Sequence, residues 1–82
     1  MLLQEITGKK IAVNCLTREE CERIVNMFDT DNWKKKSLMG GHDTYGEDVC
    51  YENYDGNQCY APADFFKEHG FEVIPSTDIV NP

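Results

Sequence analysis

The order of hydrophobic and polar residues along the first third of the chain predicts one strand followed by one helix. The apolar run Lys10–Cys15 favours a central strand, and a helix-start signal follows it directly. Thr17 can cap this helix, and Glu20 completes a capping box. Four apolar residues then recur at helical spacing, which predicts one buried face. They are Cys21, Ile24, Val25 and Phe28.

The next segment has no such regularity. Asp29–Asn32 consists of residues that prefer turns to helix interiors, so we expect the helix to stop there. Trp33 follows, and we expect its large side chain to lie mostly buried under the sheet. Lys34–Leu38 predicts at most a short strand, because the pair Gly40–Gly41 comes soon after it. Met39–Gly46 is then expected to be an exposed loop.

A β-hairpin is predicted in the middle of the chain. Asp48–Tyr54 and Gln58–Tyr60 have the composition of short strands, and the Asp-Gly turn at residues 55–57 between them is typical of a hairpin. Side chains alternate between the two faces of a strand. We expect Val49 and Tyr51 to point into the core, which leaves the other face for solvent or a partner.

The last third of the chain predicts a short helix and a final strand. Pro62–His69 suits a helix, since proline is favoured at a first helical position and Gly70 can end the helix. Phe71–Ile74 is mostly apolar and predicts the final strand. Ser76–Val80 can form one capped helical turn.

These elements predict a single α+β domain over residues 1–82. The order strand, helix, hairpin, helix, strand matches the split βαβ arrangement, in which two helices cover one face of an antiparallel sheet. We therefore expect a ferredoxin-like βαββαβ fold, or a variant with one extra short strand.

Composition restricts the classes of partner. The net charge is −7 and the calculated pI is about 4.6. Nucleic-acid binding draws much of its affinity from Lys and Arg, so direct nucleic-acid binding is not expected. The N-terminal residues lack the features of a secretory signal, and no window has the roughly 20 apolar residues of a membrane span. We expect a cytosolic protein that does not bind membranes.

One segment stands out as a candidate binding face. Ser37–Phe66 contains all four tyrosines and six carboxylates but no Lys or Arg. Tyrosines anchor interfaces, and spaced carboxylates can imitate a phosphate backbone toward a basic groove. An ordinary solvated face is the alternative. The residues that we predict to bind a partner are Asp43, Tyr45, Glu47, Asp48, Glu52, Tyr54, Asp55 and Asn57.

Catalytic and metal-binding functions find little support. The four cysteines and two histidines lack the spacing of structural zinc motifs, and in the cytosol free buried thiols are expected. Cys50, His42 and Asp43 could be drawn as a triad, but no nucleophile motif surrounds Cys50. We predict no enzyme activity, no cofactor and no metal.

Four segments resemble those of a loose group of small, mostly uncharacterised accessory proteins of phages and prophages of Gram-positive bacteria. They are Lys10–Cys15, Thr17–Glu20, the lone Trp33 and Phe65–Ile74. The similarity covers most of the chain but not Leu38–Asn57. It implies a viral protein made inside the bacterial cell, and such proteins often inhibit host machinery.

The leading functional hypothesis is therefore an inhibitor, similar to anti-CRISPR proteins, that occupies the basic surface of a host defence or nucleic-acid enzyme. A second hypothesis is a sponge for a small signalling nucleotide, in which aromatic rings stack on the base and lysines hold the phosphates. The residues of that alternative site are Trp33, Lys34, Lys35, Lys36 and Tyr45. A third is a structural or regulatory module that forms a homodimer through a sheet edge.

Overall fold

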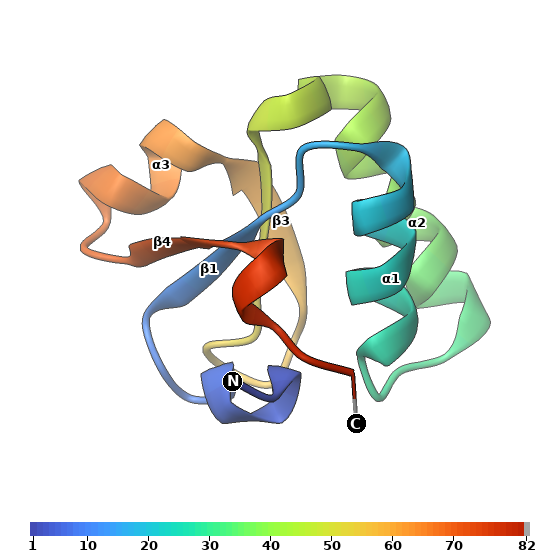
Figure 1. Ribbon diagram of the computed structural model, residues 1–82, viewed down its shortest axis with the longest axis horizontal. Coiled ribbons are helices and arrows are strands. Elements are labelled where there is room, and N and C mark those ends of the chain that lie inside the picture. The colour runs from blue at the N-terminus through green and yellow to red at the C-terminus, as the bar shows by residue number, and fades with distance from the viewer. Residues whose placement is uncertain (82) are drawn as a thin grey trace.

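The computed structural model describes residues 1–81 and contains a four-stranded sheet with helices packed on both of its faces (Figure 1). The strands are β1 (Ile11–Asn14), β2 (Val49–Glu52), β3 (Cys59–Pro62) and β4 (Glu72–Pro75). The α-helices are α1 (Arg18–Met27), α2 (Asn32–Tyr45) and α3 (Ala63–Glu68). The shorter 3₁₀ helices are η1 (Leu3–Ile6), η2 (Gly46–Asp48) and η3 (Ser76–Asp78).

The sheet has the strand order β3-β2-β1-β4 and is mixed. β2 pairs antiparallel with both β1 and β3, and β2 and β3 form the predicted hairpin. β4 pairs parallel with β1, so the expected antiparallel, ferredoxin-like sheet is wrong at this pair. The reason is α3, which carries the chain from the end of β3 back across the sheet so that β4 runs in the direction of β1. The α+β class is confirmed.

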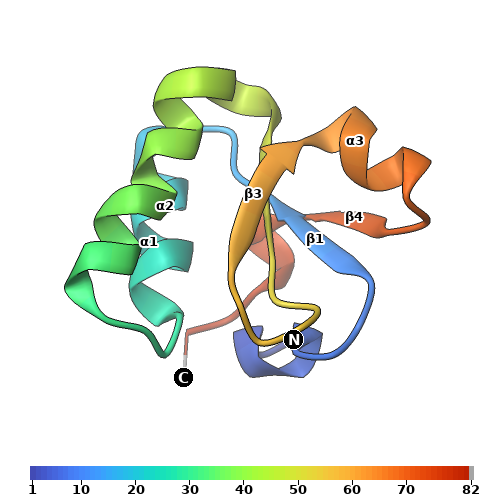
Figure 2. The same cartoon turned by 180° about the vertical axis from the view of Figure 1, so that it is seen from behind.

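Helices cover both faces of the sheet rather than one. α1 and α2 lie side by side over one face, and α3 covers the other (Figures 1 and 2). The two helices expected on a single face, α1 and α3, are therefore on opposite faces. Neighbouring residues of β1 explain this, because Val13 faces α1, Ala12 faces α3, and both are fully buried.

α1 begins and packs as predicted. Thr17 Oγ1 accepts a hydrogen bond from the Glu20 backbone N–H at 3.2 Å, which caps the helix. The predicted apolar stripe, including Ile24 and Val25, is buried against the sheet. The capping signal and the helical spacing were thus sufficient to locate this helix.

α2 corrects the interpretation of the following segment. The expected short strand at Lys34–Leu38 and the expected loop at Met39–Gly46 are both wrong, because one helix spans them. Asp31, in the presumed stop signal, caps this new helix by accepting a hydrogen bond from the Lys34 backbone N–H at 2.8 Å. Trp33 lies in the first turn and is 77% exposed, so its predicted burial is also wrong.

The pair Gly40–Gly41 serves packing and not chain flexibility. A Cβ atom at Gly41 would lie 2.7 Å from Cδ2 of Tyr60 and 2.8 Å from Cγ2 of Val49. Glycine at this position lets α2 approach β2 and β3 closely. At Gly40 the nearest atom to such a Cβ would be the Tyr60 hydroxyl at 3.8 Å, which is ordinary contact.

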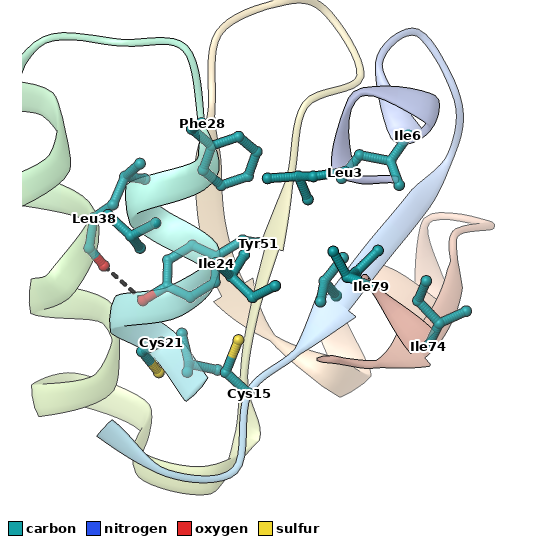
Figure 3. Packing of buried hydrophobic residues seen from close by; sticks show 13 residues of the cluster. Leu3, Ile6, Cys15, Cys21, Ile24, Phe28, Leu38, Tyr51, Ile74 and Ile79 are labelled. Carbon is teal, nitrogen blue, oxygen red and sulfur yellow. Dashed lines mark hydrogen bonds between the residues drawn. The ribbon is translucent and has the colours of Figure 1, made fainter. Parts of the chain in front are cut away.

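The larger core lies between the sheet and the α1–α2 pair (Figure 3). Val49 and Tyr51 point into it and are fully buried, as predicted. The Tyr51 hydroxyl donates a hydrogen bond to the Leu38 carbonyl at 2.8 Å, which joins β2 to the middle of α2. The smaller core, on the α3 face, is formed by Ala12, Cys50 and Phe66.

All four cysteines are free thiols, as expected, but only three of them are buried. Cys15, Cys21 and Cys50 pack as small apolar residues, and burial raises the pKa of the Cys50 thiol to about 11. Cys59, at the start of the edge strand β3, is exposed. The buried thiols are therefore structural.

Candidate functional site

The eight residues predicted to bind a partner divide between opposite ends of the β2–β3 hairpin. Four of them, Asp43 to Asp48, lie at the end of α2 and in η2, before β2. The other four, Glu52 to Asn57, lie at the end of β2 and in the hairpin turn, residues 53–58. The four residues of β2 separate the groups by about 13 Å, and Figure 1 shows η2 and the hairpin turn at opposite ends of the molecule. They cannot form one continuous tip.

The first group gains carboxylates from α1. α1 and α2 run antiparallel, so the first turn of α1 lies beside the last turn of α2. Arg18 Nη1 contacts Asp43 Oδ1 at 3.4 Å, and Arg18 Nε contacts Glu22 Oε1 at 3.4 Å. We call the surface around Arg18 the acidic end. Its residues are Glu19, Glu22, Asp43, Tyr45, Glu47 and Asp48.

Acidic side chains outnumber cations at the acidic end. Arg18 takes part in both ion pairs found within residues 1–81. The exposed carboxylates of Glu19, Glu47 and Asp48 therefore have no salt-bridge partner in that part of the chain. A surface of this kind offers hydrogen-bond acceptors and negative charge, and it attracts a positively charged partner.

Hydrogen bonds from a side chain of β1 to backbone carbonyls hold the acidic end in place. Asn14 Nδ2 donates hydrogen bonds to the Glu47 carbonyl at 3.0 Å and to the Val49 carbonyl at 3.1 Å. Gly46 ends α2 with a φ of 58°, a conformation that favours glycine, and so turns the chain into η2. Glu47 and Asp48 thus project from an anchored turn and not from a loose loop.

Tyr45 supplies an aromatic side chain to the acidic end. It is 39% exposed, and its ring makes an edge contact with Tyr60, with the centroids 6.2 Å apart. A tyrosine supported from beneath loses little conformational entropy when it is covered by a partner. Tyr45 therefore has the properties of an interface anchor.

At the hairpin turn, by contrast, the acidic side chains stabilise the turn itself. Glu52 is only 8% exposed, and its Oε2 accepts a hydrogen bond from the Tyr54 backbone N–H at 2.6 Å. The expected exposure of Glu52 is thus wrong, because its carboxylate turns back onto the backbone of its own hairpin. Asp55 Oδ1 accepts the Asn57 backbone N–H at 3.0 Å. Tyr54 is 46% exposed and packs on Phe71.

The residues of the alternative nucleotide site are not brought together. Trp33, Lys34, Lys35 and Lys36 lie in the first turns of α2, whereas Tyr45 is its last residue. Twelve residues of helix separate Trp33 from Tyr45 by about 18 Å. Lys35 Nζ is also engaged with the Asn26 carbonyl at 3.3 Å. These side chains do not line one pocket for a small nucleotide.

Sequence reasoning missed the contributions of Arg18, Glu19, Glu22 and Asn14. The signal that could have found them is Asp31, which caps α2 instead of only ending α1. A helix starting at Asp31 would have predicted that α1 and α2 are antiparallel, and hence that the first turn of α1 contacts the last turn of α2. The role of Asn14 depends on strand pairing and has no local signature.

Two further observations limit the chemistry. Within residues 1–81 no three His, Cys, Asp or Glu side chains are grouped so as to hold a metal ion. In the same part of the chain, the helices are too short or too polar to cross a membrane. Comparison with protein-family models, with curated proteins and with solved structures found no match for this chain.

Proposed function

We propose that this chain is a small binding protein that covers a basic surface of another protein with its acidic end. The observation that carries the proposal is that Arg18 contacts both Glu22 and Asp43, which joins the carboxylates of α1 to those at the end of α2, directly before η2. The resemblance to phage accessory proteins suggests the biological setting. The partner would be a host defence or nucleic-acid enzyme, which the chain inhibits by occupying its basic groove.

Two properties of the acidic end support this function. Its carboxylates outnumber its cations, so a basic partner would relieve repulsion that the chain itself does not neutralise. Tyr45 adds an exposed aromatic ring between the two acidic segments, and interfaces obtain much of their affinity from such anchors. A carboxylate array with one aromatic anchor suits recognition better than catalysis, which requires a nucleophile next to a base.

The test is affinity capture with the tagged chain from a Gram-positive bacterial lysate, followed by an activity assay of the captured enzyme. We expect a partner whose binding weakens as salt is raised, because screening reduces the attraction between exposed charges. A triple variant with Asp43→Lys, Glu47→Lys and Asp48→Lys should lose at least about tenfold in affinity.

A matched control separates the acidic end from net charge. Glu68→Lys, Glu72→Lys and Asp78→Lys change the net charge by the same amount at exposed positions elsewhere. This control should still bind and inhibit the partner much more tightly than the acidic-end variant does. Equal affinity of the two triple variants would contradict the proposal.

A further inference from the structure

A groove of about 510 Å³ lies at the end of the molecule opposite the acidic end. It opens between η1, the end of α1 and the hairpin turn, and Figure 1 shows η1 beside that turn. Ligand-binding clefts commonly measure about 300–1,000 Å³, so the groove is large enough for a short peptide segment. It is separate from the surface to which we assign the proposed function.

The floor of the groove is apolar and belongs to the larger core. Leu3 and Phe28 line it and are 3% and 4% exposed, and both belong to the larger core. Met27 lines the same side and is half-buried. A large aliphatic side chain placed on this floor would gain contact with atoms that folding has already fixed, so little ordering would be required.

One wall of the groove is a connected set of polar side chains. Asn53 Nδ2 donates to Thr7 Oγ1 at 3.0 Å, and Gln58 Nε2 donates to Asn53 Oδ1 at 3.2 Å. Gln58 is only 7% exposed, and its Oε1 accepts no hydrogen bond from residues 1–81. This oxygen is not enclosed by the fold, and the hydrogen bond of its own amide nitrogen to Asn53 holds it in place, so it can accept a hydrogen bond from a peptide N–H.

The charge of the groove selects for a cation. Asp29 is the one charged side chain among the residues that line it, and this carboxylate is exposed. The chain as a whole has a net charge of −7. An acidic peptide would be repelled, whereas a Lys or Arg next to the apolar side chain could lie beside Asp29.

We infer that the groove binds a peptide segment of a partner protein in which a large aliphatic residue is followed by Lys or Arg. The aliphatic side chain rests on Leu3 and Phe28, the peptide N–H donates to Gln58, and the cation approaches Asp29. The interaction is a second contact, independent of the acidic end.

The test is an NMR titration of the ¹⁵N-labelled full chain with the blocked peptide acetyl-Gly-Leu-Lys-Gly-amide. We expect saturable shifts confined to the amides of the groove, among them Asp29 and Gly56. Replacing the peptide's Leu by Ala or its Lys by Glu should weaken binding several-fold. Asp29→Asn should lower affinity about 2–5-fold, as for an exposed ion pair. Glu68→Gln, which changes net charge equally on α3, should not.

A second variant tests the hollow itself. Gln4 is exposed on η1 at the groove, and Gln4→Trp should fill the space and abolish the shifts without disturbing the core. The inference is overturned if the variant binds the peptide as the wild type does, or if the Lys and Glu peptides bind equally. Chemical-shift changes that spread over the acidic end would also overturn the inference. So would the absence of any change at about 10 mM peptide, a concentration at which even millimolar affinity is detectable.

Discussion

The acidic end and the groove use polar side chains in opposite ways. At the acidic end Glu19, Glu47 and Asp48 project from ordered backbone and find no cation among the described residues. At the hairpin turn the polar side chains bond one another, as Asn53 does with Gln58. The first arrangement leaves charge on an open surface, and the second leaves a hollow of defined shape. A single acidic stretch in the sequence therefore contributes to two surfaces of different chemistry.

The two surfaces differ because different secondary-structure elements form them. The acidic end is formed by the antiparallel helices α1 and α2, which place Arg18 beside Asp43, and by η2, which follows α2 directly. The groove is formed by short segments, η1 and the hairpin turn, which meet the end of α1 without filling the space between them. Long-range electrostatics should therefore govern binding at the acidic end, and side-chain fit should govern binding in the groove.

The largest effect on stability is expected from Gly41→Ala, which disturbs the packing of α2 against β2 and β3. The new Cβ would clash with the Tyr60 ring and with Val49, both of which are supported by the core. We expect a loss of about 1–3 kcal/mol in the free energy of unfolding, as in overpacked cores. Urea denaturation measures it.

Gly40→Ala is the matched control for that variant. At Gly40 the added methyl group meets only an ordinary contact, and alanine favours helix over glycine by up to about 1 kcal/mol. We therefore expect Gly40→Ala to be neutral or stabilising. If the two variants had the same stability, α2 would not be packed on β2 and β3 as described.

A smaller effect is expected from Asn14→Ala, which loosens the acidic end alone. The variant removes two hydrogen bonds to the carbonyls of Glu47 and Val49. We expect a loss of about 1–1.5 kcal/mol and faster amide hydrogen exchange in η2. Asn57→Ala at the hairpin turn is the control, and it should change stability little. Unchanged exchange in η2 would argue against the anchoring role of Asn14.

The smallest expected effect is a pH-dependent loss of stability when Glu20 is replaced, which a replacement of its neighbour Glu19 should not cause. The Ser76 hydroxyl donates to the Glu20 carboxylate, and this bond lowers the pKa of Glu20 despite the opposing effect of burial. A lowered carboxyl pKa stabilises the fold above the ordinary value of 4.5, and this stability is lost as the pH falls through the lowered pKa.

Glu20→Gln should therefore cost up to about 1 kcal/mol at neutral pH, and the difference from wild type should shrink in acid. Urea denaturation at neutral pH and below pH 4.5 measures both values. Glu19→Gln is the control, since the Glu19 carboxylate accepts no hydrogen bond within residues 1–81. A constant difference across this pH range would contradict the role of the Ser76 bond.

Most of the elements were predictable because their signals are local. The capping box at Thr17 located α1, Asp-Gly located the hairpin, and Pro62 with Gly70 bracketed α3. α2 was missed because glycine has poor helix propensity, so Gly40–Gly41 indicated a loop. Glycine is required at position 41 because a larger residue would clash with Tyr60 and Val49, which are distant in the sequence. The parallel pairing of β4 likewise depends on how α3 crosses the sheet.

The candidate site was predicted in part. The acidic stretch was recognised from composition, and Asp43, Tyr45, Glu47 and Asp48 do lie on one surface. Glu52 does not belong with them, because the length of β2 separates it from η2 and its side chain is buried. The groove could not be foreseen, since Phe28, Leu3 and Gln58 come from three distant segments that only the fold brings together.

The most direct test of two independent surfaces is to measure groove binding in the variant that destroys the acidic end. The Leu-Lys peptide is titrated into wild type and into the triple variant of Asp43, Glu47 and Asp48, at about 0.15 M salt, where the Debye length of about 8 Å is shorter than the distance between the ends. We expect equal peptide affinity in both proteins, while the triple variant no longer captures the basic partner. A parallel loss of peptide affinity would contradict it and show that the two ends form one surface.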